Sequence, residues 1–522
     1  MYRNLFLGFA LDKQGNYEEA EQAYERATKS KPKDPQAWQG LIKLYEKQGS
    51  KKVDKYQNAA TSLAVIYGEL DDMYKCQDVI DKFTVFAKSQ GTRTQHRKSL
   101  EIVLPSSPVY QFLEGRVPHP AHTYQTIAQI TEAEEKERMN KEIGERRTRL
   151  GSKISQVTLE VKREIFNNSP LEEVYTKIID WSDDDDIRRQ YEEQLLQHCY
   201  DALLVAPATQ QAEKRTKVEK LARDMVIINH PFKLAWDVDI EWKDHSEIEK
   251  WDVDVLREYV DFFPGSGLGK VLKGYMTSEV WPFPPPPPAP KSESSDYSTD
   301  SDEEGGVMLS GGDASAERLM LMTEGMSEAG NSILAHRLMG EYYAFLEEHE
   351  SVVETMRAAL KLIAAEHFRT GITFSNSSQA IKAMLGTALV YYQSPKNHPE
   401  ASAIFEELLQ QNPRSTKALI GTGLIFEEDE DYPSAIDFLE RALRRAPDNI
   451  RVMAEAAWVK ALNGDYETGR NALMDCLDKM DPADSRMRDL RSETQYRIGM
   501  CIWHLDSSRS ARKDRKGAYS YF

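Results

Sequence analysis

Residues 415–449 decide the fold, and they read STKALIGTGLIFEEDEDYPSAIDFLERALRRAPDN. A small-residue step at Gly423 is followed by a second set, in which Leu439, Ala442 and Pro447 stand four, seven and twelve residues after Ala435. This spacing predicts two short antiparallel helices, because small residues allow close approach and larger apolar residues fill the space between the helices. The proline then ends the second helix.

The same spacing recurs at both ends of the chain, and it resembles the tetratricopeptide (TPR) repeat, whose period is about 34 residues. Near the N-terminus, Tyr24, Ala27 and Pro32 follow Ala20 at the same three offsets. We therefore predict an all-α solenoid of TPR type. The residues of its expected repeat signature are Leu7, Gly8, Ala20, Tyr24, Ala27, Pro32, Trp38, Leu41, Tyr45, Gly340, Gly386, Gly423, Ala435, Leu439, Ala442, Pro447 and Gly499.

Four regions are expected. Residues 1–90 form the N-terminal repeats, and residues 91–281 form a helical middle that continues the solenoid. Residues 282–317 contain a run of prolines followed by an acidic, serine-rich stretch, which cannot bury a core, so this linker is predicted to be disordered. Repeats resume over 318–522 and stop inside the second helix of a unit, which predicts an array truncated at its C-terminus.

Helix boundaries are also expected within these regions. Two longer helices are predicted over 53–67 and 73–88, followed by a proline-rich connector at 104–120 and a charged helix over 123–150. Four consecutive aspartates, 183–186, stand where carboxylates favour the positive end of a helix dipole.

Composition limits the classes of function. The net charge of −18 would repel nucleic-acid phosphates, so no direct sequence-specific binding of nucleic acid is expected. Four cysteines without a C-x-x-C pair favour a reducing compartment and buried structural thiols. No stretch approaches the roughly 18 apolar residues of a membrane helix. We expect a soluble, cytoplasmic protein, with a nuclear pool left open.

Catalytic and ligand-binding motifs are weak. Residues 265–270 (GSGLGK) lack the glycine and the Ser/Thr that a phosphate-binding loop needs at Pro264 and Val271. His119 and His122 have no visible partner ligands. The basic residues between 509 and 516 lack interleaved aromatic residues for stacking bases, so a solvated loop is favoured over contact with RNA or an acidic partner. We expect no enzyme activity, no cofactor and no metal.

The linker itself suggests three roles. Its prolines could dock an SH3 or WW domain. Ser298 and Ser301 precede an acidic run and are possible phosphosites, while a plain spacer is the simplest reading.

Three stretches are similar to the TPR scaffold subunits of fungal superkiller (Ski) complexes. They are DPQAWQGLIKLYEKQG at 34–49, SPLEEVY at 169–175 and RKDRKGAYSYF at 512–522. The resemblance implies a scaffold for a helicase subunit, a WD-repeat subunit and an exosome adaptor in 3′–5′ cytoplasmic mRNA decay. It also implies that this chain is the N-terminal portion of a longer protein.

Two alternatives remain open at this level. A TPR array presents a groove, lined mainly by the first helix of each pair, that takes up peptide segments or helices. Another TPR adaptor, associated with chaperones or a ubiquitin ligase, would use the same groove. An enzyme with added repeats would need a catalytic domain within 120–280, where the sequence reads as helices.

Overall fold

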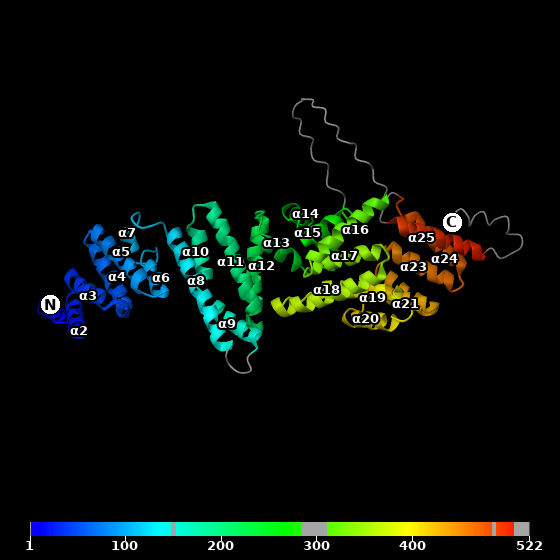
Figure 1. Cartoon of the computed structure of the whole chain (residues 1–522). Coiled ribbons are helices and arrows are strands. Elements are labelled where there is room, and N and C mark those ends of the chain that lie inside the picture. Colours follow the sequence, from blue (N-terminus) through cyan, green and yellow to red (C-terminus); the bar gives the residue numbers. More distant parts are fainter. Residues whose placement is uncertain (1, 148–152, 284–310, 483–486, 506–520, 522) are drawn as a thin grey trace, which may run out of the picture. The chain divides into compact units, whose positions relative to one another are not determined.

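The computed structural model describes residues 2–147, 153–283, 311–482, 487–505 and 521. Across these ranges the regular structure is helical (Figure 1), as the repeat spacing predicted. The chain divides into two compact units, which we call the N-terminal unit, Met1–Leu221, and the C-terminal unit, Ala222–Phe522. Within the described part of the chain, no helix combines the length and the apolar character that a membrane crossing requires.

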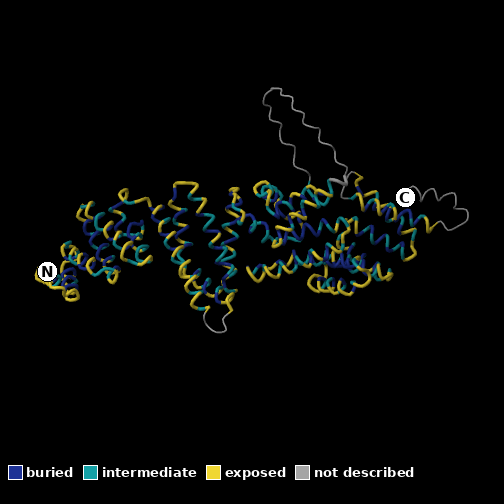
Figure 2. Tube along the Cα trace, in the orientation of Figure 1, coloured by how far each residue is buried: buried dark blue, intermediate teal, exposed yellow. Residues whose placement is uncertain are grey.

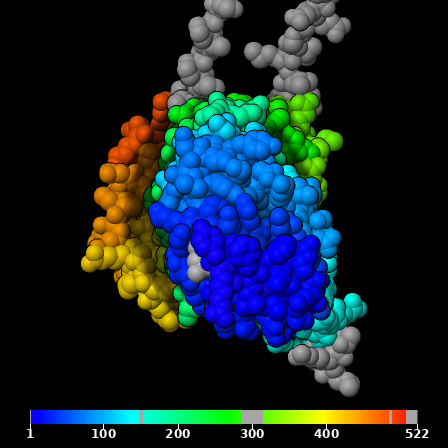
Figure 3. Space-filling model, turned by 90° about the vertical axis from the view of Figure 1, so that its left-hand side faces the viewer, coloured from blue at the N-terminus to red at the C-terminus, as the bar shows by residue number. Residues whose placement is uncertain are grey.

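In the N-terminal unit, α1 to α6 each pack on the next helix, and α8 packs on α6, α9 and α10. Figure 3 views the end that carries the first helices, which form a closely packed surface (blue). The helices are α1 (Tyr2–Lys13), α2 (Tyr17–Ser30), α3 (Pro35–Gln48), α4 (Val53–Glu69), α5 (Met73–Gln90), α6 (Arg93–Glu101), α7 (Tyr110–Leu113), α8 (Pro120–Arg147), α9 (Ile154–Asn168), α10 (Leu171–Trp181), α11 (Asp185–Val205) and α12 (Ala208–Ile227), the last crossing the boundary between the units.

Side-chain caps fix several of these helix starts. The carboxylate of Asp34 accepts the N–H of Gln36 at 3.0 Å, and the hydroxyl of Thr92 and the side chain of Gln95 form a reciprocal capping box at α6. Asp184 caps α11 by accepting the N–H of Asp186 at 2.9 Å, which confirms the helix start predicted from the aspartate run. The predicted helices 53–67 and 73–88 are confirmed as α4 and α5.

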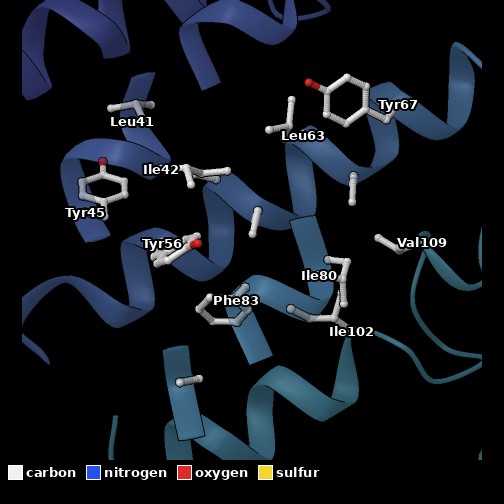
Figure 4. Packing of buried hydrophobic residues seen from close by; sticks show 14 of the residues in the cluster. Leu41, Ile42, Tyr45, Tyr56, Leu63, Tyr67, Ile80, Phe83, Ile102 and Val109 are labelled. Atoms are coloured by element: carbon white, nitrogen blue, oxygen red, sulfur yellow. The ribbon is translucent and has the colours of Figure 1, made fainter. Parts of the chain in front are cut away.

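Buried side chains of consecutive helices form the core of the N-terminal unit. The ring of Tyr56 from α4 lies 4.9 Å from that of Phe83 and 5.0 Å from that of Phe86, both on α5. Figure 4 shows Leu41, Ile42 and Tyr45 on one side of Tyr56 and Phe83, and Ile80 and Ile102 on the other side. Buried residues in general occupy the helix faces turned toward a neighbouring helix (Figure 2).

The C-terminal unit begins with α13 (Lys233–Glu241), α14 (Val253–Phe262), α15 (Gly267–Met276) and α16 (Gly311–Glu328). Helical pairs follow: α17 (Ile333–Phe345) with α18 (His349–Thr370), α19 (Ser375–Tyr391) with α20 (His398–Gln411), α21 (Thr416–Glu428) with α22 (Tyr432–Leu443), and α23 (Ile450–Leu462) with α24 (Tyr466–Lys479); α25 (Arg488–Leu505) is the last described helix.

The predicted linker, 282–317, needs one correction. Most of it lies outside the described residues, including Ser298 and Ser301. Helix α16, however, begins at Gly311, so the last part of the segment is helical and not disordered. The helix is held by α15, since Gly274 accommodates Met322 and the backbones meet at Gly267 and Gly325. This packing outweighs the low helix propensity of its two leading glycines.

Candidate protein-binding groove

The C-terminal unit contains a groove with a volume of about 860 Å³. Its walls come mainly from the first helix of each pair, as the repeat pattern predicted, together with α25 and the segment before α14. The contributing side chains follow the helical spacing of one face in each helix. They include Arg337, Glu341 and Ala344 on α17, Ala380, Ala383, Met384, Thr387 and Tyr391 on α19, Lys417, Ile420 and Leu424 on α21, Arg451 and Glu455 on α23, and Asp489, Glu493 and Arg497 on α25.

The middle of the groove is apolar and made of small or flexible side chains. Helix α19 contributes alanines and Met384, and α21 contributes Ile420 and Leu424. Small residues leave room for an inserted side chain, and methionine adapts its shape to what it contacts. This surface therefore suits apolar side chains of a bound segment.

A charged cluster occupies the wall formed by α23 and α25. Nη1 of Arg497 lies 3.0 Å from Oε2 of Glu455, and Nη2 lies 2.7 Å from Oε1 of Glu493. The guanidinium also stacks over the Trp458 ring, 5.5 Å from its centroid. Arg497 thus forms ion pairs with two carboxylates.

Glu427 adds a third carboxylate to this cluster. It lies on α21 beyond Leu424, near Glu455, Glu493 and Arg497, and behind the side chains that line the groove. Its Oε2 atom is buried and has no hydrogen-bond partner among the residues that the structure describes. Burial, with the nearby carboxylate of Glu455, raises the pKa of Glu427 to about 8. Burial also raises the pKa of Glu455, although Arg497 acts in the opposite direction.

The other end of the groove is organised by Arg337, whose side chain is buried. Its two terminal nitrogens donate to the backbone carbonyls of His245 and Ser246, both at 2.6 Å. Its Nε donates to Glu341 at 3.1 Å, and Glu341 also accepts the Tyr275 hydroxyl at 2.6 Å. The charge of this arginine is therefore already used in holding the groove wall together.

The signature residues lie between the helices and not in the groove. Sixteen residues after Gly8, Gly340 and Gly423 stand Tyr24, Met356 and Leu439, and each side chain occupies the space that a Cβ at its glycine would need. Gly386 faces the ring of Phe405 in the same way. Ala20, Ala27, Leu41, Tyr45, Ala435, Ala442 and Gly499 are also buried.

Four signature positions are not buried in the core. Pro32 and Pro447 are exposed beyond the ends of α2 and α22, where a proline is expected. Trp38 is partly buried and donates from Nε1 to the carbonyl of Pro32 at 2.9 Å. Leu7 is 45% exposed and does not contribute to the core as predicted. One residue step turns a helix by about 100°, which directs Leu7 away from the face that Gly8 presents to Tyr24.

The weak ligand motifs find structural explanations. Ser266 caps α15 within the glycine-rich stretch 265–270, and Nζ of Lys270 pairs with Glu324 and Glu328, both at 2.8 Å. The rings of His119 and His122 lie 6.4 Å apart. Within the described ranges, no group of three or more His, Cys, Asp or Glu side chains could hold a metal ion.

Sequence reasoning missed one arrangement that looks catalytic. Nε2 of His398 lies 3.1 Å from the Ser394 hydroxyl, and Nδ1 lies 2.8 Å from Asp429. Nε2 also lies 3.1 Å from the carbonyl oxygen of Val390. A carbonyl oxygen only accepts, so this contact favours a proton on Nε2 and removes the lone pair that a general base would use toward Ser394. His398 therefore has a structural role, because it connects the turn before α20 to the end of α19 and to Asp429 after α21.

Comparison with known proteins agrees with the repeat architecture. Tetratricopeptide-repeat families match residues 4–44, 105–192 and 385–450. The chain is 29% identical to Superkiller protein 3 of Schizosaccharomyces pombe over 545 aligned residues, which cover 99% of this chain and 39% of that protein. It is 23% identical to Superkiller protein 3 of Saccharomyces cerevisiae, covering 95% of this chain and 38% of that protein.

The chain thus spans less than two thirds of these relatives. Among solved structures, the hetero-tetramer Cut9–Hcn1 of the APC/C aligns with a TM-score of 0.36 and 11% identity, over 98% of this chain and 92% of that chain.

Proposed function

We propose that this tetratricopeptide-repeat chain, similar to Superkiller protein 3 along nearly its whole length, is a non-catalytic scaffold of a superkiller-type complex. In this role it supports 3′–5′ cytoplasmic mRNA decay beside a helicase subunit, a WD-repeat subunit and an exosome adaptor. The observation that carries the proposal is the similarity to the fission-yeast protein, which extends over 99% of the chain.

The geometry supports a scaffold in two ways. The described helices stack into units whose cores hold the repeats together, and the C-terminal unit presents a groove of about 860 Å³ for a protein segment. Arg337 donates to backbone carbonyls and Arg497 pairs with Glu455. These contacts stabilise the groove wall, which suits a surface that binds a protein. Contacts spread along such a surface bind a partner without a single deep pocket.

Co-purification tests the proposal. The full-length protein, tagged at its natural locus, is expected to recover a helicase, a WD-repeat protein and exosome-associated factors in comparable amounts. A tagged TPR protein of similar size from another complex is the matched control. Recovery of chaperones or ubiquitin-ligase subunits without the helicase would contradict the proposal and favour the other adaptor class.

Two further readouts follow from the same proposal. Removing the protein is expected to lengthen the half-life of a reporter mRNA degraded from its 3′ end, whereas a reporter degraded from its 5′ end is the control. Imaging of the tagged protein is expected to place it in the cytoplasm, and the same images measure any nuclear pool.

A further inference from the structure

The charge along the groove of the C-terminal unit is unevenly distributed. Acidic residues outnumber basic ones among its lining side chains by seven to four. Two of the four basic side chains, Arg337 and Arg497, are buried and already paired. The other two, Lys417 and Arg451, are exposed in the first turns of α21 and α23. Five of the seven acidic residues, Glu247, Glu249, Glu347, Asp489 and Glu493, are exposed as well. The excess of negative charge therefore lies on the exposed walls of the groove.

The excess is greatest around Arg497. This single guanidinium pairs with Glu455 and Glu493. The nearby Glu427 has a buried oxygen that no described residue meets with a hydrogen bond. A cation placed here would meet the shielded carboxylate of Glu455, so it would gain more from this pairing than at a fully exposed site, while the half-exposed Glu493 stays in contact with water. Next to this cluster lie the ring of Tyr391 and the apolar surface of α19.

We propose that this groove binds a protein segment that carries lysine or arginine next to apolar side chains. The basic side chain pairs with the carboxylates of Glu455 and Glu493, and the apolar side chains lie on the alanines and Met384 of α19. The inference rests on the proposed scaffold function and adds the chemistry of the partner. Acidic or phosphate-bearing ligands are repelled by the same carboxylates.

The probe for this proposal is a random dodecapeptide library displayed on phage and selected against the full chain. The enriched peptides are expected to carry net positive charge, and their affinity is expected to fall as ionic strength rises. Enrichment of neutral or acidic peptides, or no enrichment above an uncoated surface, would overturn the proposal.

Two substitutions with opposite expected effects separate the charge effect from damage to the fold. Glu493→Lys is expected to weaken binding of the enriched peptides by about tenfold or more. Lys417→Glu adds a carboxylate at an exposed position near a helix N-terminus, where the dipole favours it, and is expected to tighten binding by about threefold to fivefold. Misfolding cannot produce a gain of affinity, so an unchanged or lower affinity of the Lys417 variant contradicts the proposal.

A matched control lies outside the groove. Glu406 is exposed on α20, the second helix of its pair, and does not line the groove. Glu406→Lys makes the same charge change as Glu493→Lys and is expected to leave affinity within about twofold. An equal loss in both variants would show that net charge alone governs binding and would overturn the assignment of the groove.

The two proposals can fail separately. Basic peptides that depend on Glu493, in the absence of any co-purified helicase, would leave the groove assignment standing and remove the superkiller-type function. A co-purified helicase with no preference for basic peptides would do the reverse.

Discussion

Arg497 on α25 forms an ion pair with Glu455 on α23, with Nη1 and Oε2 3.0 Å apart and both side chains largely shielded from water. The pair joins the first helices of two successive repeats across the groove wall. Breaking this ion pair should therefore lower the free energy of unfolding as well as change ligand binding.

Arg497→Ala is expected to lower the free energy of unfolding by about 3 kcal/mol, because it leaves the carboxylate of Glu455 buried without its partner. Replacing both residues by leucine should recover most of this loss, since the buried carboxylate of Glu455 is then gone and the half-exposed Glu493 is solvated by water. Chemical denaturation followed by circular dichroism measures both values. Arg357→Ala, which breaks a half-exposed pair with Glu400, is the control and should cost no more than about 1 kcal/mol. Equal losses for Arg357 and Arg497 would contradict the importance of burial.

Gly421 is expected to tolerate no side chain, because a Cβ there would overlap the ring of Phe405. Gly421→Ala should lower stability by about 1–3 kcal/mol despite the higher helix propensity of alanine. Phe405→Leu makes room, so the double variant should be more stable than the sum of the single losses predicts. Gly144, in the last turn of α8 with open space around it, is the control, and its change to alanine should be neutral or stabilising. Strict additivity of the Gly421 and Phe405 losses would count against this contact.

Stability should fall as pH rises through neutrality. Burial raises the pKa of Glu427 to about 8 and that of Glu241 to about 7, from the ordinary value of 4.5. Between pH 4.5 and these values the folded state binds more protons than the unfolded state, so the free energy of unfolding decreases with pH and levels off above about pH 8. Between pH 5.5 and 9 the expected change is on the order of 5 kcal/mol, because each pKa unit corresponds to about 1.4 kcal/mol. Thermal unfolding measured from pH 5.5 to 9 checks it.

Glu427→Gln should flatten the part of this profile between pH 7 and 8, while Glu406→Gln on the exposed face of α20 should leave it unchanged. A wild-type profile that is flat or rises over this range would refute the assignment of the proton uptake to buried glutamates.

The four thiols should be inert in the folded protein. Cys76, Cys199, Cys476 and Cys501 are buried and free, and burial raises the pKa of each, to about 11 for Cys76, Cys199 and Cys501. A thiolate is the reacting form, so both access and ionisation oppose reaction. Titration with a thiol reagent at pH 8 should detect little in native protein and four thiols after unfolding in guanidinium. Rapid native reaction at any one of them would show local opening of its helix.

Much of this fold could be predicted because the repeat spacing acts locally. The offsets after Ala435 placed Leu439 and Ala442 on the buried side of α22, and the predicted starts of α4 and α5 agree with the structure. The errors lie where the outcome depends on contacts with a neighbouring helix. Leu7 was expected among the repeat signature residues but is exposed. Gly421 was overlooked, because only the position of the Phe405 ring shows that this residue must stay small.

Less of the candidate groove than of the fold could be predicted from the sequence. That the first helices would line a groove followed from the repeat pattern, but nothing in the sequence pairs Arg497 with Glu455 across the intervening α24. The buried oxygen of Glu427 likewise results from side chains that arrive from other repeats. Charge pairing in a groove is a property of the stacked array and not of any one repeat.

The ring of Phe405 fills space at Gly386 in its own repeat and at Gly421 in the next one, and Tyr24 lies in the same way between Gly8 and Gly40. Each of these aromatic side chains therefore packs against glycines of two successive repeats. Whole repeats can be duplicated or lost in evolution without penalty only if the incoming neighbour brings a glycine to the receiving position. Among homologous sequences, ring size at 405 should accordingly covary with side-chain size at 421, and the boundary of an inherited module should fall after that second glycine.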